Sequence, residues 1–127
     1  MIMVMSVSQP RVVVSSSNHV IRNQLEEIIR KSGAEGVVFS SEHELVSFIK
    51  TSQVDLFILD LESSVFSDLS AIKQHRVFND GITTPLLIIT NPEDSFWQNE
   101  FDDDSALIIH KPLNPGVVKQ QLRFLLA

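Results

Sequence analysis

The apolar residues of this 127-residue chain gather in five short runs at fairly even spacing. Each run is rich in β-branched residues or leucine and is apolar at successive positions, so both faces of an extended segment would be apolar. Strands have this composition when helices cover both sides of a parallel sheet. The runs predict strands over residues 12–14, 36–39, 56–59, 85–89 and 106–109.

Segments with helical spacing of apolar residues alternate with these runs. The first predicted helix opens at Asn18 or His19 and closes at Gly33. The second begins at Ser41, with Glu44 three residues later at the spacing of a capping box. The positions expected to face inward in these two helices are Val20, Ile21, Leu25, Ile28 and Ile29 in the first and Leu45, Phe48 and Ile49 in the second.

Three further helices complete the pattern. They are predicted over residues 68–78, over residues 93–101 and from Asn114-Pro115 onward, where proline takes the first helical position. The last of them is expected to bury a face made of Val117, Val118, Leu122, Leu125 and Leu126. Five strands alternating with five helices predict an α/β fold, a doubly wound five-stranded parallel sheet flanked by five helices. We expect one domain over residues 10–127, preceded by a tail of residues 1–9.

Composition and charge narrow the class of protein. The chain has no Cys, which excludes disulfide scaffolds, thiolate metal sites and thiol nucleophiles. No apolar stretch approaches the roughly 18 residues of a membrane span, and the first residues lack the basic flank of a secretory signal, so we expect a cytoplasmic protein. With 16 Asp and Glu against 10 Lys and Arg, the net charge of −6 argues against nucleic-acid binding by this domain.

Residues capable of chemistry follow three of the predicted strands. Asp60 follows the third strand, Thr90 the fourth and Lys111-Pro112 the fifth. In doubly wound sheets, ligands bind at the carboxyl ends of the strands. We therefore expect an acid, a hydroxyl and an amine to share one pocket.

This ordered set of strands and strand-end residues resembles the receiver domain of response regulators in two-component signalling, a CheY-like superfamily with flavodoxin-like architecture. The resemblance covers nearly the whole chain, from Arg11 to the last predicted helix. It implies that Asp60 takes a phosphoryl group from a histidine kinase or a phosphotransfer protein. It further implies that Lys111 pairs with the phosphoryl oxygens and that Thr90 hydrogen-bonds one of them.

Receiver domains also hold a Mg²⁺ ion with two adjacent acids just after the first strand, and this sequence has serines there. The acidic pair falls at Ser16 and Ser17, or at Ser15 and Ser16 with a shift of one residue. A hydroxyl lacks the charge that Mg²⁺ prefers in its ligands. Magnesium binding is therefore predicted to be weak or absent, with Asp60 and Glu62 as the remaining ligands. Serines also suit the capping of a helix, a role compatible with the loss of the metal.

Other positions depart from the family in the same direction. The loop 62–68 lacks the family's usual Pro and Gly, and Asn91 replaces a small residue that gives the phosphate access. Ile108 stands where the family has an aromatic switch. These departures predict a degenerate receiver, or pseudo-receiver, that is not an enzyme.

Aromatic residues and acids gather between the fourth and fifth strands. Phe96, Trp97 and Phe101 lie in the predicted helix 93–101, and those that do not pack in the core would anchor a partner. Residues 93–104 hold six acids and no Lys or Arg, so the whole net charge lies there and a basic partner surface is expected. Protein contacts, including a homodimer, are expected on the face formed by this segment, the fifth strand with Ile108 and the last helix. An output domain in a longer chain is a further expectation from the family.

Three functions follow, in order of preference. The first is a two-component signalling module that acts mainly through protein contacts, with phosphorylation at Asp60 lost or weakened. The second is a working phosphoacceptor. The third, of another class, is a flavodoxin-like domain that binds a phosphate or small ligand on the loop Ser15–Asn18, although this loop has no glycine to let the backbone approach a phosphate.

Overall fold

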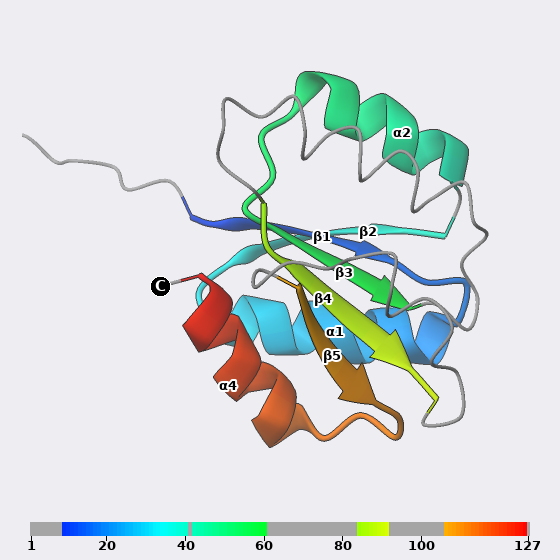
Figure 1. Ribbon diagram of the computed structural model, residues 1–127. Helices are drawn as coiled ribbons and strands as arrows, with labels where there is room; N and C mark the ends of the chain where they lie inside the picture. The colour runs from blue at the N-terminus through cyan, green and yellow to red at the C-terminus, as the bar shows by residue number, and fades with distance from the viewer. Residues whose placement is uncertain (1–8, 41, 61–83, 92–105, 127) are drawn as a thin grey trace, which may run out of the picture.

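Five parallel strands form one sheet at the centre of the fold (Figure 1). The computed structural model describes residues 9–40, 42–60, 84–91 and 106–126. The strands are β1 (Arg11–Ser15), β2 (Glu35–Phe39), β3 (Leu56–Asp60), β4 (Leu86–Thr90) and β5 (Ala106–His110). Their order across the sheet is β2-β1-β3-β4-β5, so the direction of winding reverses between β1 and β3. This is the doubly wound arrangement that the alternation of strands and helices predicts.

The inner strands of the sheet are buried on both faces. Every residue of β3 and β4 is buried, as is every residue of β1 after Arg11. The edge strand β2 is half-buried along most of its length. The central position of β1, β3 and β4 therefore explains their continuous apolar runs, because a strand covered on both sides has no solvent-exposed face.

Helices cover both faces of this sheet. Helices α1 (His19–Lys31) and α4 (Pro115–Leu125) lie together on one face, and α2 (Glu42–Thr51) lies on the other (Figure 1). The first layer of the core joins α1 and α4 to alternate residues of the strands, and the second joins α2 to the residues between them. The two layers follow from the period of two along each strand, which sends successive side chains to opposite faces.

The ends of the helices have the caps that their sequences predict. The Asn18 side chain accepts hydrogen bonds from the first turn of α1, and the Asn114 side chain does the same for α4, with Pro115 at the first helical position. After α1, Gly33 has φ +82°, a left-handed conformation that a residue without Cβ adopts at little cost. These local features fix where α1 and α4 begin and where the chain turns back into β2.

The predicted strands are confirmed, each within one residue of its predicted ends, and three of the predicted helices are present in the described ranges. Two inward positions were predicted wrongly: Val20 and Val117 are exposed. Each lies one position before a buried residue of its helix, Ile21 and Val118, and one residue turns the helix by about 100°, which takes the side chain off the core-facing stripe. The predicted helices 68–78 and 93–101 and the cap at Ser41 lie outside the described residues.

The helices in the described ranges are α1, α2 and α4. Each is too short or too polar to cross a membrane.

Candidate functional site

The carboxyl ends of β1, β3, β4 and β5 bring the predicted site residues to one edge of the sheet. Asp60 is the last residue of β3, Thr90 is the last residue of β4, Ser16 follows β1 and Lys111 follows β5. Asp60, Thr90 and Ser16 are all buried. The structure thus brings together the acid, hydroxyl and amine that the sequence placed at three separate strand ends.

Lys111 reaches the carboxylate of Asp60 directly. Its Nζ lies 2.9 Å from Oδ1 of Asp60, whose side chain is 1% exposed against 14% for that of Lys111. Strand β4 lies between the two strands that carry them, so the side chains bridge a backbone separation of roughly 10 Å. A long cationic side chain is needed for that span. The pair neutralises a carboxylate that would otherwise be buried as an isolated charge, a costly state.

Ser16 contacts the other oxygen of the same carboxylate. Its Oγ donates a hydrogen bond of 2.8 Å to Oδ2 of Asp60 and accepts one of 3.1 Å from the backbone N–H of Asn18. Ser16 therefore lies directly beside Asp60, and it belongs to both alignments of the acidic pair, Ser16 with Ser17 and Ser15 with Ser16. Ser17, the second position of that pair, is exposed.

Thr90 and the chain after β5 complete the edge. The Thr90 hydroxyl donates to the backbone carbonyl of Asn91 at 3.4 Å, and the Thr90 carbonyl accepts from the backbone N–H of Lys111 at 2.9 Å. The Lys111-Pro112 peptide bond is cis. The backbone bond ties the residue that carries the amine to the end of β4, so Lys111 starts from a fixed position next to the site.

Two functional candidates were missed by the sequence interpretation. Arg22 of α1 donates from Nη1 to the carbonyl of Ser16 at 2.7 Å, and no motif marks a residue six positions beyond that serine. Phe124 of α4 is 69% exposed. Its spacing of seven residues from the exposed Val117 places the two on one face of the helix and could have identified it.

Of the remaining predicted site residues, the structure describes only Ile108. Ile108 lies on β5 and is 40% exposed. Glu62, Phe96, Trp97 and Phe101 lie outside the described residues, so their proposed roles stay predictions.

The side chains described at this edge do not fit a Mg²⁺ ion. Lys111 and Ser16 contact the two oxygens of Asp60, and a lysine ammonium beside the carboxylate repels a cation. Among the residues described, no three His, Asp or Glu side chains gather as a metal site requires. The hydroxyl groups of Ser16 and Ser17 are uncharged, whereas Mg²⁺ prefers charged oxygens as ligands. We therefore assign no metal-dependent step to this edge.

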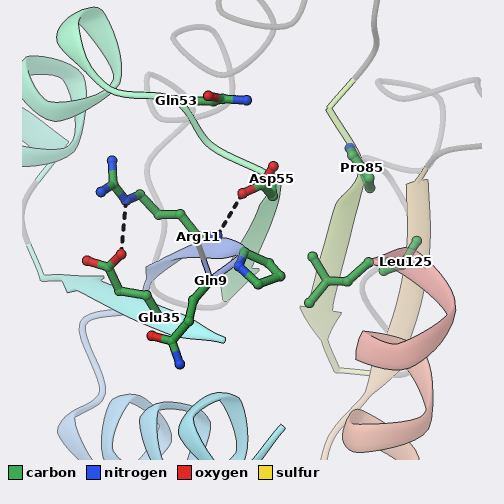
Figure 2. Close-up of a pocket in the computed structure, with 9 residues that line it drawn as sticks. Gln9, Arg11, Glu35, Gln53, Asp55, Pro85 and Leu125 are labelled. Carbon is green, nitrogen blue, oxygen red and sulfur yellow. Dashed lines mark hydrogen bonds and ion pairs between the residues drawn. The ribbon is translucent and has the colours of Figure 1, made fainter. Parts of the chain in front are cut away.

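A cavity of about 620 Å³ opens at the opposite end of the sheet (Figure 2). In this cavity, Arg11 Nε lies 3.4 Å from Oε2 of Glu35, and the Arg11 backbone N–H donates to Oδ2 of Asp55 at 2.7 Å. Arg11 thus binds Glu35 and Asp55 at the amino ends of β1, β2 and β3. The carboxyl edge with Asp60 remains the candidate site.

Comparison with known proteins identifies the fold. No protein-family model matches the sequence, and no curated protein is similar to it in sequence. Solved structures are similar in fold across almost the whole chain. Chemotaxis protein CheY4 of Vibrio cholerae matches with a TM-score of 0.77 and 19% identity, covering 93% of this chain and 99% of its own.

Two further structures give the same result. A response regulator from Thermotoga maritima has a TM-score of 0.75 at 18% identity, covering 93% of this chain and 98% of its own. The receiver domain of Francisella response regulator 1452 has a TM-score of 0.72 at 21% identity, covering 92% of this chain and 96% of its own. The chain therefore has the CheY-like fold that response-regulator receiver domains share.

Proposed function

We propose that this chain is a receiver-like signalling module that acts through protein contacts, with phosphoryl transfer to Asp60 lost or much weakened. The carrying observation is that Lys111 and Ser16 contact the two oxygens of the buried Asp60 carboxylate. A carboxylate attacks phosphorus with an oxygen lone pair, and the ion pair on Oδ1 together with the hydrogen bond on Oδ2 makes that pair less available. The module is then not an enzyme, and its signal passes through its surface.

The charge balance supports the same proposal. Phosphoryl transfer needs cations that neutralise the oxygens of the transferred group, and a divalent ion normally supplies most of that charge. Here serines occupy the positions of the acidic pair that would hold such an ion, either Ser16 and Ser17 or Ser15 and Ser16. Lys111 supplies one positive charge at this edge, and the Asp60 carboxylate already neutralises it.

A working phosphoacceptor is the second candidate, and one observation favours it. Asp60, Thr90 and Lys111 lie at one edge of the sheet, and the receiver resemblance assigns them the roles of acceptor, hydroxyl and amine. Under this alternative, a histidine kinase or phosphotransfer protein is the partner, and Glu62 and water complete a metal site.

The third candidate, a phosphate site on the serine loop, has less support. A phosphate at the start of a helix is bound by free backbone N–H groups. The Asn18 side chain accepts from the N–H groups of Val20 and Ile21 at 2.9 and 3.3 Å, and Ser16 Oγ accepts from that of Asn18. Much of the loop's capacity to donate is thus used within the loop.

The contact face we propose is the solvent side of α4 together with the edge strand β5. Its exposed apolar residues are Ile108, Val117 and Phe124. Helix α4 carries Lys119 and Arg123 and no acid, whereas residues 93–104 carry six acids and no base. Opposite charges on two parts of one chain make a second copy the first partner to test.

The decisive experiment uses a small phosphodonor and intact mass. The purified chain is incubated with acetyl phosphate and Mg²⁺, beside a competent receiver domain as a positive control, and its mass is measured. We expect no phosphoryl adduct. An adduct that disappears in Asp60→Asn but persists in Asp55→Asn would overturn the proposal in favour of the phosphoacceptor.

A further inference from the structure

Arg22 links helix α1 to the loop that holds the candidate site. Its guanidinium Nη1 donates to the backbone carbonyl of Ser16 at 2.7 Å, across six residues of sequence. The side chain is half-buried, and it lies one turn into α1, just beyond the Asn18 cap. A charged donor at this distance makes a strong hydrogen bond. The carbonyl of Ser16 is thereby fixed relative to α1.

The same serine carries the contact to Asp60. Ser16 is 2% exposed, and its Oγ lies 2.8 Å from Oδ2 of Asp60. A hydroxyl keeps one acceptor only if the backbone of its residue is held in place. The Arg22 bond holds the Ser16 carbonyl, and the backbone N–H of Asn18 donates to Ser16 Oγ as a second contact. The path therefore runs from Arg22 to the Ser16 backbone, and from the Ser16 hydroxyl to Asp60.

The charges along this path explain the poor fit to a divalent ion. The Lys111 ammonium contacts Oδ1 of Asp60. The Arg22 guanidinium contacts the carbonyl of Ser16, the residue whose hydroxyl binds Oδ2 of Asp60. A metal ion at this edge would meet two side-chain cations. It would also find the Ser16 carbonyl, an oxygen of the kind that ligates hard cations, already accepting from Arg22.

We propose that Arg22 is a positioning residue that keeps the Ser16 hydroxyl on Asp60 and whose charge disfavours a divalent cation at this edge. The proposal rests on the proposed function, because it explains how the site is held without a metal. Arg22 acts through Ser16 and has no role in any covalent step.

The first test is a double-mutant cycle in urea unfolding. Ser16→Ala is made in the wild-type chain and in Arg22→Gln, and the loss in the folding equilibrium constant is compared. We expect the Ser16→Ala effect to be smaller by about threefold or more when Arg22 is absent, as for residues that act through one another. Arg22→Lys, which keeps a charged donor, should restore part of the coupling. Arg30→Gln, an exposed change on the same helix, should leave the Ser16→Ala effect unchanged.

The second test measures Mn²⁺ affinity by titration calorimetry, in a chain with the acids restored by Ser16→Asp and Ser17→Asp. The Arg22 contact is to the backbone of residue 16, so these substitutions leave its acceptor in place. We expect Arg22→Gln in this chain to tighten Mn²⁺ binding about fivefold, since one positive charge near a divalent ion is removed. Arg30→Gln should not.

The outcomes separate this inference from the proposed function. The positioning role is overturned if the losses in stability caused by Arg22→Gln and Ser16→Ala simply add. It is also overturned if Arg30→Gln reduces the Ser16→Ala effect as much as Arg22→Gln does. A Mn²⁺ affinity that Arg22→Gln leaves unchanged, or no binding in either chain, overturns the charge role. A phosphoryl adduct on Asp60 of the wild-type chain overturns the proposed function while the coupling of Arg22 to Ser16 stands.

Discussion

Lys111 Nζ and Asp60 Oδ1 lie 2.9 Å apart and join the residue after β5 to the last residue of β3, across the intervening strand β4. The acid is 1% exposed, so the pair belongs to the interior of the sheet edge and not to its surface. A buried ion pair adds less stability than its short distance suggests, because both ions have lost their water. Removing one partner is much more costly, because the other charge stays buried alone.

The first prediction concerns this asymmetry. Lys111→Met leaves the Asp60 carboxylate buried without its cation, and we expect the free energy of unfolding to fall by about 3 kcal/mol. Asp60→Asn combined with Lys111→Met removes both charges and should recover most of that loss. Urea unfolding at pH 7 measures all three proteins. Equal losses in the single and the double variant would show that the pair does not carry the effect.

The second prediction concerns the two asparagine caps. Asn18→Ala and Asn114→Ala each remove a side-chain acceptor that bonds two backbone N–H groups, at 2.9 and 3.3 Å in both helices. We expect each to lower the free energy of unfolding by about 1 kcal/mol. Asn23→Ala, at an exposed position inside α1, is the matched control and should be neutral or slightly stabilising because alanine favours the helix. A loss at Asn23 as large as at Asn18 would contradict the capping role.

These caps show which part of the structure could be predicted from sequence. Strand positions, the Asn18 and Asn114 caps and the Gly33 turn depend on short-range chemistry, and all are present as expected. The meeting of Asp60 and Lys111 was also predictable, because parallel strands carry their carboxyl ends to the same edge.

The contact of Arg22 was not predictable in this way. It depends on how α1 packs over the end of β1, and neither residue type nor spacing selects a backbone carbonyl as the acceptor. The exposure of Val20 and Val117 was missed for a related reason. An apolar residue type alone does not place a side chain in the core, because its angle around the helix decides which way it points. Both valines lie beside the core-facing stripe of their helix and are exposed to water.

The third prediction concerns acid dependence at the surface of α1. The hydrogen bond from Lys31, and then its charge, lower the pKa of Glu27 from its ordinary value of 4.5. Because the pKa is lower in the folded state, the stabilisation is present above pH 4.5 and is lost as the pH falls through the folded value. Glu27→Gln should therefore reduce the difference in stability between pH 7 and pH 3, and salt should shrink the effect further because the pair is exposed. Thermal unfolding at the two pH values, with and without 1 M NaCl (roughly a 3 Å screening length), measures this difference in stability. If Glu27→Gln shows the same difference between pH 7 and pH 3 as the wild-type chain, this account is contradicted.

The fourth prediction tests the proposed contact face. Phe124→Gln removes an exposed aromatic ring, so we expect stability to change by no more than about 0.5 kcal/mol. If a second copy binds this face, the same substitution should weaken self-association about tenfold, as the loss of a central aromatic contact does. Sedimentation velocity over a range of protein concentrations measures the dimerisation constant.

A matched control separates the face from general hydrophobicity. Val20→Gln removes an exposed apolar side chain at the start of α1 and should leave the dimerisation constant unchanged. A chain that stays monomeric at all concentrations would remove the second copy as the occupant of this face.

The last prediction places acids at the two serines of the candidate site. Ser16→Asp places a new carboxylate beside Asp60, and Ser17→Asp adds a second acid at the next, exposed position. Like charges at a buried edge repel one another. In EDTA we expect the free energy of unfolding to fall by about 2 kcal/mol, the order of an unpaired buried charge after relaxation. Mg²⁺ should return stability, and the gain should rise with the logarithm of its concentration once that exceeds Kd, because a ligand that binds only the folded state stabilises it. Ser40→Asp, an exposed acid just after β2, controls for added charge alone and should show no response to Mg²⁺. If the wild-type chain gains as much stability from Mg²⁺ as the restored chain, the serines are not what weakens the metal site, and the second candidate function gains the advantage.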